Sequence, residues 1–271
     1  MDAKLQRRVQ RYGWDKAEPY YERYWQAQLA PARDRLLAMA ALTAGERVLD
    51  VACGTGLVTF PAAEAVGAGG SVSAVDISAA MAERVTADAA RRSLKQVQSA
   101  RMEAEALDFP DRRFDVVLCA LGLMYVPDPP RAFREMRRVL RDGGRAVASV
   151  WGARARCGWA DIFPIVESRV ASDVCPMFFG LGAGDTLAST MAAAGFADVR
   201  TERVTTTLEY DSAEAACGAA FAGGPVALAY SRFDAATRDE AHAEYLASIQ
   251  RYEDGGGYAI PGEFVIAWGR K

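Results

Sequence analysis

One stretch of the chain limits the fold more than any other. It starts with a short apolar run at residues 48–51, turns at a glycine-rich loop, continues as a helical pattern over 57–66 that ends at Gly67, and returns to a strand pattern at 71–75. A strand, a helix and a second strand in this order make a βαβ unit, whose two strands lie parallel because the helix carries the chain back across the sheet. We therefore expect a fold built around a parallel sheet.

The same alternation continues along the chain, with Ser78 as a suitable N-cap for an alanine-rich helix. The further predicted elements are a helix to about residue 92, strands near 98–102 and 114–120, a helix over 129–141, a strand over 145–151, a helix over 185–194, and strands over 199–210 and 258–268. Counted with the first two strands, this makes seven. The sequence thus predicts an α/β, Rossmann-like fold: a seven-stranded, mostly parallel sheet with helices on both faces.

Two segments interrupt the alternation and are predicted to be helical cap insertions. Residues 152–184 are rich in aromatic residues and glycine, and residues 212–251 have a helical pattern. Residues 1–42 are also helical in pattern and aromatic, which predicts an N-terminal helical lid segment. Residues 43–271 contain no linker that would separate a second domain, so we expect them to form one domain that carries both insertions.

Composition narrows the classes of partner. The 271 residues carry a formal net charge of only −3, with 35 acidic and 32 basic residues, so no strong field attracts nucleic acid or a membrane surface. The five cysteines form no C-x-x-C pair, which disfavours a disulfide framework and a zinc site; we expect no metal. The basic start at residues 1–8 has no apolar segment behind it, so we expect a cytoplasmic protein with a small-molecule substrate. Composition leaves open whether the protein forms a homodimer.

The glycine loop after the first strand indicates the class of ligand that binds there. Gly54 and Gly56 allow backbone N–H groups to approach a ligand closely. A dinucleotide fingerprint requires a third glycine where this chain has Thr59, which counts against NAD and FAD. Asp76 ends the second strand, where a carboxylate can accept hydrogen bonds from both hydroxyls of a ribose. It reads equally well as a solvated aspartate at a strand end.

Five motifs resemble, in order and spacing, those of the class I S-adenosylmethionine-dependent methyltransferases. They are Val-Leu-Asp-Val-Ala-Cys-Gly-Thr-Gly at 48–56, Val-Asp-Ile-Ser at 75–78 with Met81, Glu-Ala-Glu-Ala-Leu-Asp-Phe-Pro-Asp at 103–111, Phe-Asp-Val-Val-Leu at 114–118 and Val-Leu-Arg-Asp-Gly-Gly-Arg at 139–145. Within that superfamily they look most like the type 11 branch, near the ubiquinone/menaquinone-biosynthesis C-methyltransferases. The resemblance covers about residues 42–150 closely. It implies S-adenosylmethionine as cofactor and methyl transfer as the reaction.

The resemblance also implies roles for individual residues. The backbone of Gly54, Thr55 and Gly56 would meet the methionine part of the cofactor, Asp50 would anchor its ammonium group through water, and Asp76 would hold the ribose.

At the adenine, the carboxylate of Glu103 would accept from the exocyclic amine, and the N–H of Ala104 would donate to a ring nitrogen. The family more often has aspartate at the position of Glu103, and the longer side chain makes that contact less certain. The remaining residues of the predicted cofactor site are Met81 and Leu107 on the two faces of the adenine, Ala120 near the reacting end, and Ile77 and Glu105.

The sequence does not identify a catalytic residue. A methyl group on a sulfonium is already activated, so a positioned nucleophile suffices and an acid or base is optional. Many relatives have a histidine shortly after the fourth strand, where this chain has Leu123, Met124 and Tyr125. The candidates are Tyr21, Tyr125 and the sole histidine, His242, which reads more readily as a surface residue of a helix.

The residues of the two insertions indicate the chemical character of the methyl acceptor. Both could cover the crevice beyond the carboxyl ends of the strands, where ligands of open α/β sheets bind. Their aromatic side chains favour a hydrophobic or aromatic acceptor, although core packing must explain most of them. Arg154 and Arg156 could bind a carboxylate or be solvated, and Tyr20, Tyr21 and Trp25 could form an aromatic lid. The predicted apolar pocket comprises Trp159, Phe163, Met177, Phe178, Phe179, Phe221, Tyr230 and Phe233.

Two other functions stay open. An intact glycine loop also fits a non-catalytic, S-adenosylmethionine-binding subunit of a partner enzyme. Cys157, Cys175 and Cys217 could converge on a soft substrate such as arsenite, as in the arsenic methyltransferases of the same superfamily, although no spacing supports this.

Overall fold

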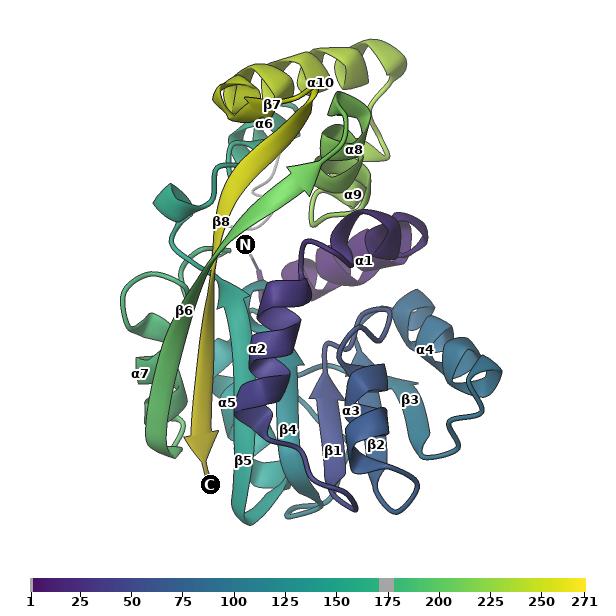
Figure 1. Cartoon of the computed structure of the whole chain (residues 1–271), viewed down its shortest axis with the longest axis vertical. Coiled ribbons are helices and arrows are strands. Elements are labelled where there is room, and N and C mark those ends of the chain that lie inside the picture. The colour runs from purple at the N-terminus through teal and green to yellow at the C-terminus, as the bar shows by residue number, and fades with distance from the viewer. Residues whose placement is uncertain (1, 171–177) are drawn as a thin grey trace.

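The computed structural model describes residues 2–170 and 178–271, which form one mixed sheet with helices on both faces (Figure 1). The strands follow one another in the sheet in the order β3-β2-β1-β4-β5-β8-β6, and β7 pairs with β8. They are β1 (Arg47–Val51), β2 (Ser71–Asp76), β3 (Val97–Arg101), β4 (Phe114–Ala120), β5 (Leu140–Trp151), β6 (Ala197–Tyr210), β7 (Glu253–Asp254) and β8 (Gly257–Arg270).

The α/β fold with a mostly parallel sheet is confirmed. Strands β1 to β5 are all parallel to one another, and β8 runs antiparallel between β5 and β6. The seven predicted strands all form, and the short β7 is an eighth. It is the first arm of a hairpin whose two loop residues, Gly255 and Gly256, have φ of +58° and +88°, as a tight turn of this type requires. Two residues are too short a strand to give a sequence pattern.

The helices cover the sheet as the alternation predicts. Helices α2 and α3 lie in front of the sheet in Figure 1, and α5 lies behind it. The helices of the sheet layers are α2 (Ala30–Ala40), α3 (Thr59–Val66), α4 (Ala79–Arg91), α5 (Pro129–Val139) and α7 (Thr186–Ala193). Ser78 caps α4 by accepting the N–H of Met81 at 3.1 Å, as predicted. Strand β5 begins at Leu140 rather than at residue 145, because the backbone pairs through the glycine turn with an irregular register.

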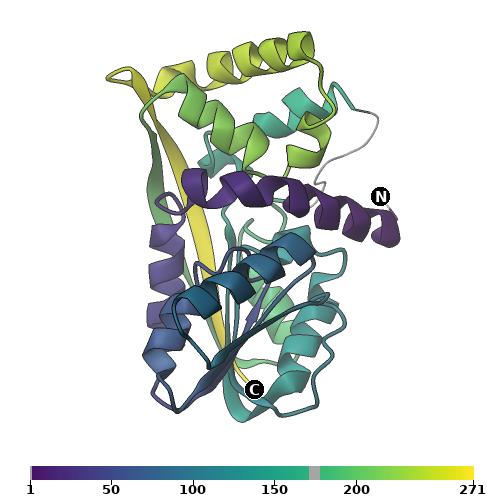
Figure 2. The same cartoon turned by 90° about the vertical axis from the view of Figure 1, so that its right-hand side faces the viewer.

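Above the sheet, the second insertion forms a helical cap on the long ends of β6 and β8 (Figures 1 and 2). Helix α1 (Ala3–Trp25) runs between this cap and the sheet domain, packed on α9 and η3 on one side and on α4 on the other. The elements above the sheet are the 3-10 helices η1 (Leu123–Tyr125), η2 (Arg154–Arg156) and η4 (Gln250–Tyr252), the π-helix η3 (Gly218–Ala222), and α6 (Ile162–Glu167), α8 (Ala213–Cys217), α9 (Ala227–Tyr230) and α10 (Ala235–Ile249).

The core explains why the central strands are uniformly apolar. Leu49, Val117, Val147 and Ile266, from four neighbouring strands, are fully buried, since helices cover both faces. Each such side chain contributes about 1.5 to 3 kcal/mol through burial. Among the described residues, no helix has both the length and the apolar composition that a membrane crossing needs.

Candidate active site

The glycine loop has the conformation that its composition predicts. Gly54 and Gly56 have φ of +54° and +95°, and the N–H of Gly56 donates to the carbonyl of Cys53 at 3.0 Å. A Cβ on Gly56 would lie 2.5 Å from the ring of Phe60, while a Cβ on Gly54 would lie 3.8 Å from the ring of Tyr21. Glycine is therefore required at 56 both for backbone conformation and for space.

The residue at the position of the missing third glycine orients a buried carboxylate. Thr59 donates from its hydroxyl to Oδ2 of Asp50 at 2.6 Å. The other oxygen, Oδ1, is buried and has no hydrogen-bond partner in the described part of the chain. Burial raises the pKa of Asp50 to about 7. An unpaired acceptor of this kind fits a ligand ammonium group, which would restore the carboxylate to its charged form.

Asp76 is buried at the end of β2, with 7% of its surface exposed, so it is not a solvated aspartate. Its two oxygens accept the N–H groups of Gly54 and Ser78, each at 2.9 Å. Burial raises its pKa to about 6, against the opposing effect of these two hydrogen bonds. Asp76 therefore fixes the glycine loop to the start of α4, and each oxygen keeps a lone pair for a ligand hydroxyl.

A cavity opens beside these residues, with an empty volume of about 1000 Å³ that includes its mouth. Its lining includes most of the predicted cofactor residues, namely Gly54, Asp76, Ile77, Met81, Glu103, Ala104, Glu105 and Ala120. Four predicted residues are not in this lining. Thr55 is buried, Gly56 lies against Phe60, Asp50 lines a smaller adjoining cavity together with Arg33 and Gln26, and Leu107 is the fourth. Met102 is a lining residue that the sequence analysis did not identify.

The carboxylate of Glu105 has a structural partner on each oxygen. Arg7 of α1 donates to Oε2 at 2.7 Å, and the N–H of Asp128 donates to Oε1 at 3.0 Å. Arg7 also lies 3.4 Å from Glu103. Glu105 therefore attaches the N-terminal helix to the loop after β3, a role that sequence analysis did not suggest.

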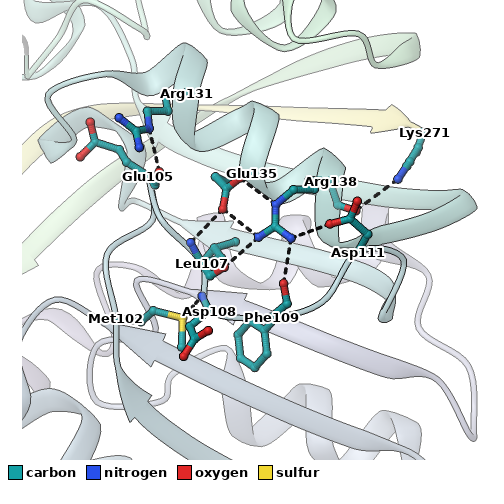
Figure 3. Close-up of polar contacts among 10 residues, drawn as sticks. All are labelled: Met102, Glu105, Leu107, Asp108, Phe109, Asp111, Arg131, Glu135, Arg138 and Lys271. Carbon is teal, nitrogen blue, oxygen red and sulfur yellow. Dashed lines mark hydrogen bonds and ion pairs between the residues drawn. The ribbon is translucent and has the colours of Figure 1, made fainter.

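A second network holds the same loop to α5 (Figure 3). Glu135 accepts the N–H of Leu107 at 2.9 Å and pairs with Arg138, whose guanidinium also donates to the carbonyls of Leu107 and Phe109 and to Asp111. Mutual stabilisation raises the pKa of Arg138 and lowers that of Glu135. The loop that carries Glu103 and Ala104 is thus fixed to α5 by charged side chains.

Helix α1 closes the cavity from above and is attached at several points. Asp15 of α1 accepts from the Ser78 hydroxyl at 2.6 Å. Glu18 and Glu22 of α1 pair with Arg84 of α4 at 3.1 and 2.7 Å. The side-chain amide of Gln6 donates to the carbonyl of Tyr125 at 3.2 Å. These contacts hold α1 over the cavity, and the role of residues 1–42 as a lid stays a prediction. Residues 171–177 of the first insertion lie outside the described residues.

Several glycines of the first insertion are required because there is no space for a side chain, not because the backbone must be flexible. A Cβ on Gly182 would lie 2.0 Å from the carbonyl oxygen of Trp151, one on Gly152 would meet Glu263, and one on Gly158 would meet Tyr252. These positions need glycine because other groups approach closely. Gly184, by contrast, has a positive φ of +50° and open space around its Cα.

The aromatic side chains separate into two groups. Trp25, Trp151, Trp159, Phe178 and Met124 line the cavity beside β4 and β5. Phe163 and Phe179 pack behind them as their ring neighbours. The aromatics of the second insertion form a separate cluster inside the cap with His242 and Tyr245, and Met177 lies outside the described residues; that cluster contains Phe221, Tyr230 and Phe233.

Of the catalytic candidates, Tyr21 and Tyr125 line the cavity and His242 does not. The Nε2 of His242 lies 3.0 Å from the hydroxyl of Tyr230, and the two rings are stacked; burial lowers the pKa of His242. Burial raises the pKa of Tyr21 above its ordinary value, with a smaller contribution from Asp76. Trp14 packs edge-on against both tyrosines. The described lining contains neither histidine nor lysine.

The cysteines that the structure describes are free and buried. Burial raises the pKa of Cys157 to about 11 and that of Cys217 to about 12, which keeps the thiols protonated. Cys175 lies outside the described residues, and within them no group of three metal-ligating side chains occurs. The exposed Arg154 and Arg156 border a shallow pocket away from the cavity, beside η4.

Comparisons with known proteins agree with this geometry. Residues 48–144 match the family described as Methyltransferase domain. The chain is 36% identical over 132 residues to aklanonic acid methyltransferase DauC of Streptomyces sp. (strain C5), a match covering 49% of this chain and 60% of that protein. It is 32% identical over 209 residues to nocamycin O-methyltransferase of Saccharothrix syringae, covering 72% of this chain and 74% of that protein.

Two solved structures share the fold. Phosphoethanolamine N-methyltransferase 2 of Haemonchus contortus, in complex with S-adenosyl-L-methionine, has a TM-score of 0.61 at 17% identity and covers 94% of this chain and 57% of its own. The [4+2]-cyclase SpnF has a TM-score of 0.56 at 19% identity and covers 91% and 82%. At such identities the likeness concerns the fold alone.

The fold, the glycine loop and the acidic strand end define the class I methyltransferase architecture. The chain belongs to the S-adenosylmethionine-dependent methyltransferases, and S-adenosylmethionine is its cofactor. The predicted placement in the type 11 branch stays a prediction, as does each residue's role toward the cofactor.

Proposed function

We propose that the protein transfers a methyl group from S-adenosylmethionine to a small, hydrophobic or aromatic acceptor bound beside the carboxyl ends of β4 and β5. The observation that carries this proposal is the change in the cavity wall along the sheet. Beside β2 and β3 the wall is polar, with Asp76 and Glu103, whereas beside β4 and β5 it is aromatic, with Trp151 and Trp159. One ligand site of each character matches a charged cofactor and an apolar acceptor.

The polar half would hold the cofactor. The backbone of residues 54–56 would lie against its methionine part, Oδ1 of Asp50 would receive the ammonium group, and Asp76 would accept from the ribose. Glu103 and Ala104 would meet the adenine. Arg33, which shares the smaller cavity with Asp50, is a candidate partner for the carboxylate of the cofactor.

When bound, S-adenosylmethionine supplies a methyl group on a sulfonium, which leaves as a neutral thioether once a nucleophile takes the methyl. The protein has to bring the nucleophile into line and keep water out, and alignment alone can lower the barrier by about 7 to 11 kcal/mol. The cover formed by α1 and the aromatic wall provide both functions.

The lining also limits the acceptor atom. Apart from the charged residues of the polar half, the ionisable side chains of the described lining are Tyr21 and Tyr125. Burial raises the pKa of Tyr21, which keeps its hydroxyl protonated and unavailable as a base. An acceptor that needs a strong base is therefore disfavoured. We propose an acidic O–H group, which loses its proton to solvent before it binds. The relatives named for aklanonic acid and for O-methylation of nocamycin are consistent with this choice.

Release of S-adenosylhomocysteine tests the proposal. The protein is incubated with S-adenosylmethionine and a panel of hydroxylated aromatic compounds of graded acidity, with amines and thiols of equal size as controls. We expect release with the acidic hydroxyl compounds. Cofactor binding without release from any compound would instead support the non-catalytic, S-adenosylmethionine-binding subunit. Release with thiols or arsenite alone would support the soft-substrate reading.

A further inference from the structure

Two tryptophans on the aromatic wall have unused hydrogen-bond donors. Trp25, at the end of α1, and Trp159, just before α6, are buried to 6% and 4% exposure and both line the cavity. The indole N–H of each is shielded from water and has no hydrogen-bond partner among the described residues. Buried donors in folded proteins are nearly always paired, because an unpaired one loses its hydrogen bonds to water. Two such donors on one wall indicate that a ligand supplies the partner.

The residue that faces the Trp25 indole N–H is a glycine. A Cβ built on Gly223 would lie 3.3 Å from Nε1 of Trp25, and Gly223 itself lines the cavity. The backbone of Gly223 has an ordinary negative φ, so its conformation does not demand glycine. With glycine at this position, no side chain lies between the backbone of the cavity wall and the indole N–H.

Aromatic rings surround Trp159. Trp151 and Phe178 meet it edge-on, with ring centroids 4.9 and 5.6 Å away. Ring faces are weak hydrogen-bond acceptors. The strong acceptor that Trp159 lacks therefore has to come from a bound molecule.

We propose that Trp25 and Trp159 determine substrate specificity by donating hydrogen bonds to carbonyl oxygen on a flat, apolar, hydroxylated acceptor. This inference rests on the proposed function. An indole N–H only donates, and a carbonyl oxygen only accepts, so the pair leaves no group unsatisfied. A ligand hydroxyl at the same place would need an acceptor of its own. A conjugated carbonyl also acidifies a hydroxyl on the same ring system, which suits a cavity half that offers no strong base.

Calorimetric titration of the complex with S-adenosylhomocysteine tests the inference without turnover. The probes are 4-methoxy-1-naphthaldehyde and 1-methoxy-4-methylnaphthalene, which have similar shape and no ionisable proton, and differ in the carbonyl. We expect the wild-type protein to bind the aldehyde at least tenfold more tightly. Trp25→Phe and Trp159→Phe should each reduce this preference about fivefold, the usual net effect of one hydrogen bond.

Two further variants separate recognition from packing. Gly223→Ala leaves both tryptophans in place and covers the Trp25 N–H with a methyl group, so it should reduce the preference as Trp25→Phe does. Trp268→Phe, on β8 and outside the cavity lining, should leave the preference unchanged. Thermal melting of each variant shows whether the fold is retained.

The outcomes are distinct. An unchanged preference in Trp25→Phe, Trp159→Phe and Gly223→Ala overturns the inference, as does failure of the wild-type complex to bind either probe. Release of S-adenosylhomocysteine from 4-hydroxy-1-naphthaldehyde is measured separately. A preference that depends on the tryptophans, without release from this or any other acceptor, contradicts the proposed methyl transfer and supports a carbonyl-binding site of another activity.

Discussion

The two halves of the cavity are built in different ways. The half beside β2 and β3 is made by backbone: a glycine loop, a strand end and a helix N-terminus held together by Asp76. The half beside β4 and β5 is made by large side chains that come from α1, from β5 and from the first insertion, and the second insertion adds only residues 223–225. The first half therefore depends on local conformation, and the second on the packing of segments that are distant in sequence.

This difference teaches where specificity can change. A backbone cradle tolerates few substitutions, because its geometry needs particular φ angles, whereas an aromatic wall can alter shape with one side chain. A single fold can thus retain one cofactor and accept many acceptors.

The largest loss of cofactor affinity is expected from a substitution of Gly56. Gly56→Ala forces a residue with a Cβ to φ +95° and places it against Phe60, which combines backbone strain with overpacking. We expect affinity for S-adenosylhomocysteine to fall about a hundredfold, measured by calorimetry. Gly67→Ala is the matched control: it also has a positive φ, of +63°, but open space and no place in the cavity. If both variants lose affinity equally, general destabilisation explains the result.

Asp76→Ala should have the next largest effect. Loss of hydrogen bonds to a charged group costs about 1.5 to 3 kcal/mol, or roughly ten- to 150-fold in affinity for the cofactor. Because Asp76 also accepts the N–H groups of Gly54 and Ser78, the melting temperature should fall too. Asp76→Asn retains one acceptor oxygen and should lose less of both. Unchanged affinity in Asp76→Ala would remove Asp76 from the cofactor site.

A pH titration examines the role of Asp50. Burial raises its pKa to about 7, so in the free protein it is largely protonated below that pH. A cofactor ammonium group favours the carboxylate, and binding then releases a proton, so affinity should rise roughly tenfold between pH 5.5 and 7. Asp76, with a pKa of about 6, contributes in the same direction. Asp50→Asn should retain only the smaller rise in affinity that Asp76 causes. An identical pH profile in the wild-type protein and in Asp50→Asn would argue against the ammonium contact.

The smallest effect is expected where α1 covers the boundary between the two halves. Arg7→Ala leaves the buried carboxylate of Glu105 without its cation and should lower the free energy of unfolding by about 1 to 3 kcal/mol. It should also speed hydrogen exchange of α1 amides with little change in cofactor affinity. Arg8→Ala, one residue along and exposed, should change stability by less than about 0.5 kcal/mol. Equal exchange in the two variants would show that Arg7 does not hold the helix.

The polar half could be predicted from sequence because its signals are local. The strand at residues 48–51, the glycines at 54 and 56 and the strand end at Asp76 follow within one βαβ unit, and each has a residue type that its conformation requires. The same reasoning found the order of strands and helices, apart from the two-residue β7.

For the aromatic half, the sequence predicts that aromatic residues are present but not which of them line the cavity. An aromatic residue in an insertion can line a cavity or pack behind it, and Trp159 and Phe163 differ in this respect although they are only four positions apart. The contacts that attach α1 could not be predicted either. In the sequence, Arg7, Asp15 and Arg84 look like solvated charges, and only the fold brings their partners next to them. The sequence also does not show that a glycine such as Gly182 is required because another part of the backbone approaches it closely.

The position of β8 in the sheet has a consequence for how the protein is made. Because β8 lies between β5 and β6, the 14 residues of β6 have no strand to pair with until residues 257–270 have left the ribosome. During synthesis β6 is then an exposed edge rich in threonine and other β-formers, the kind of segment that associates with other chains. Yield in a cell should therefore depend on the speed with which the final segment is delivered, and slow codons after residue 210 should favour aggregation over folding.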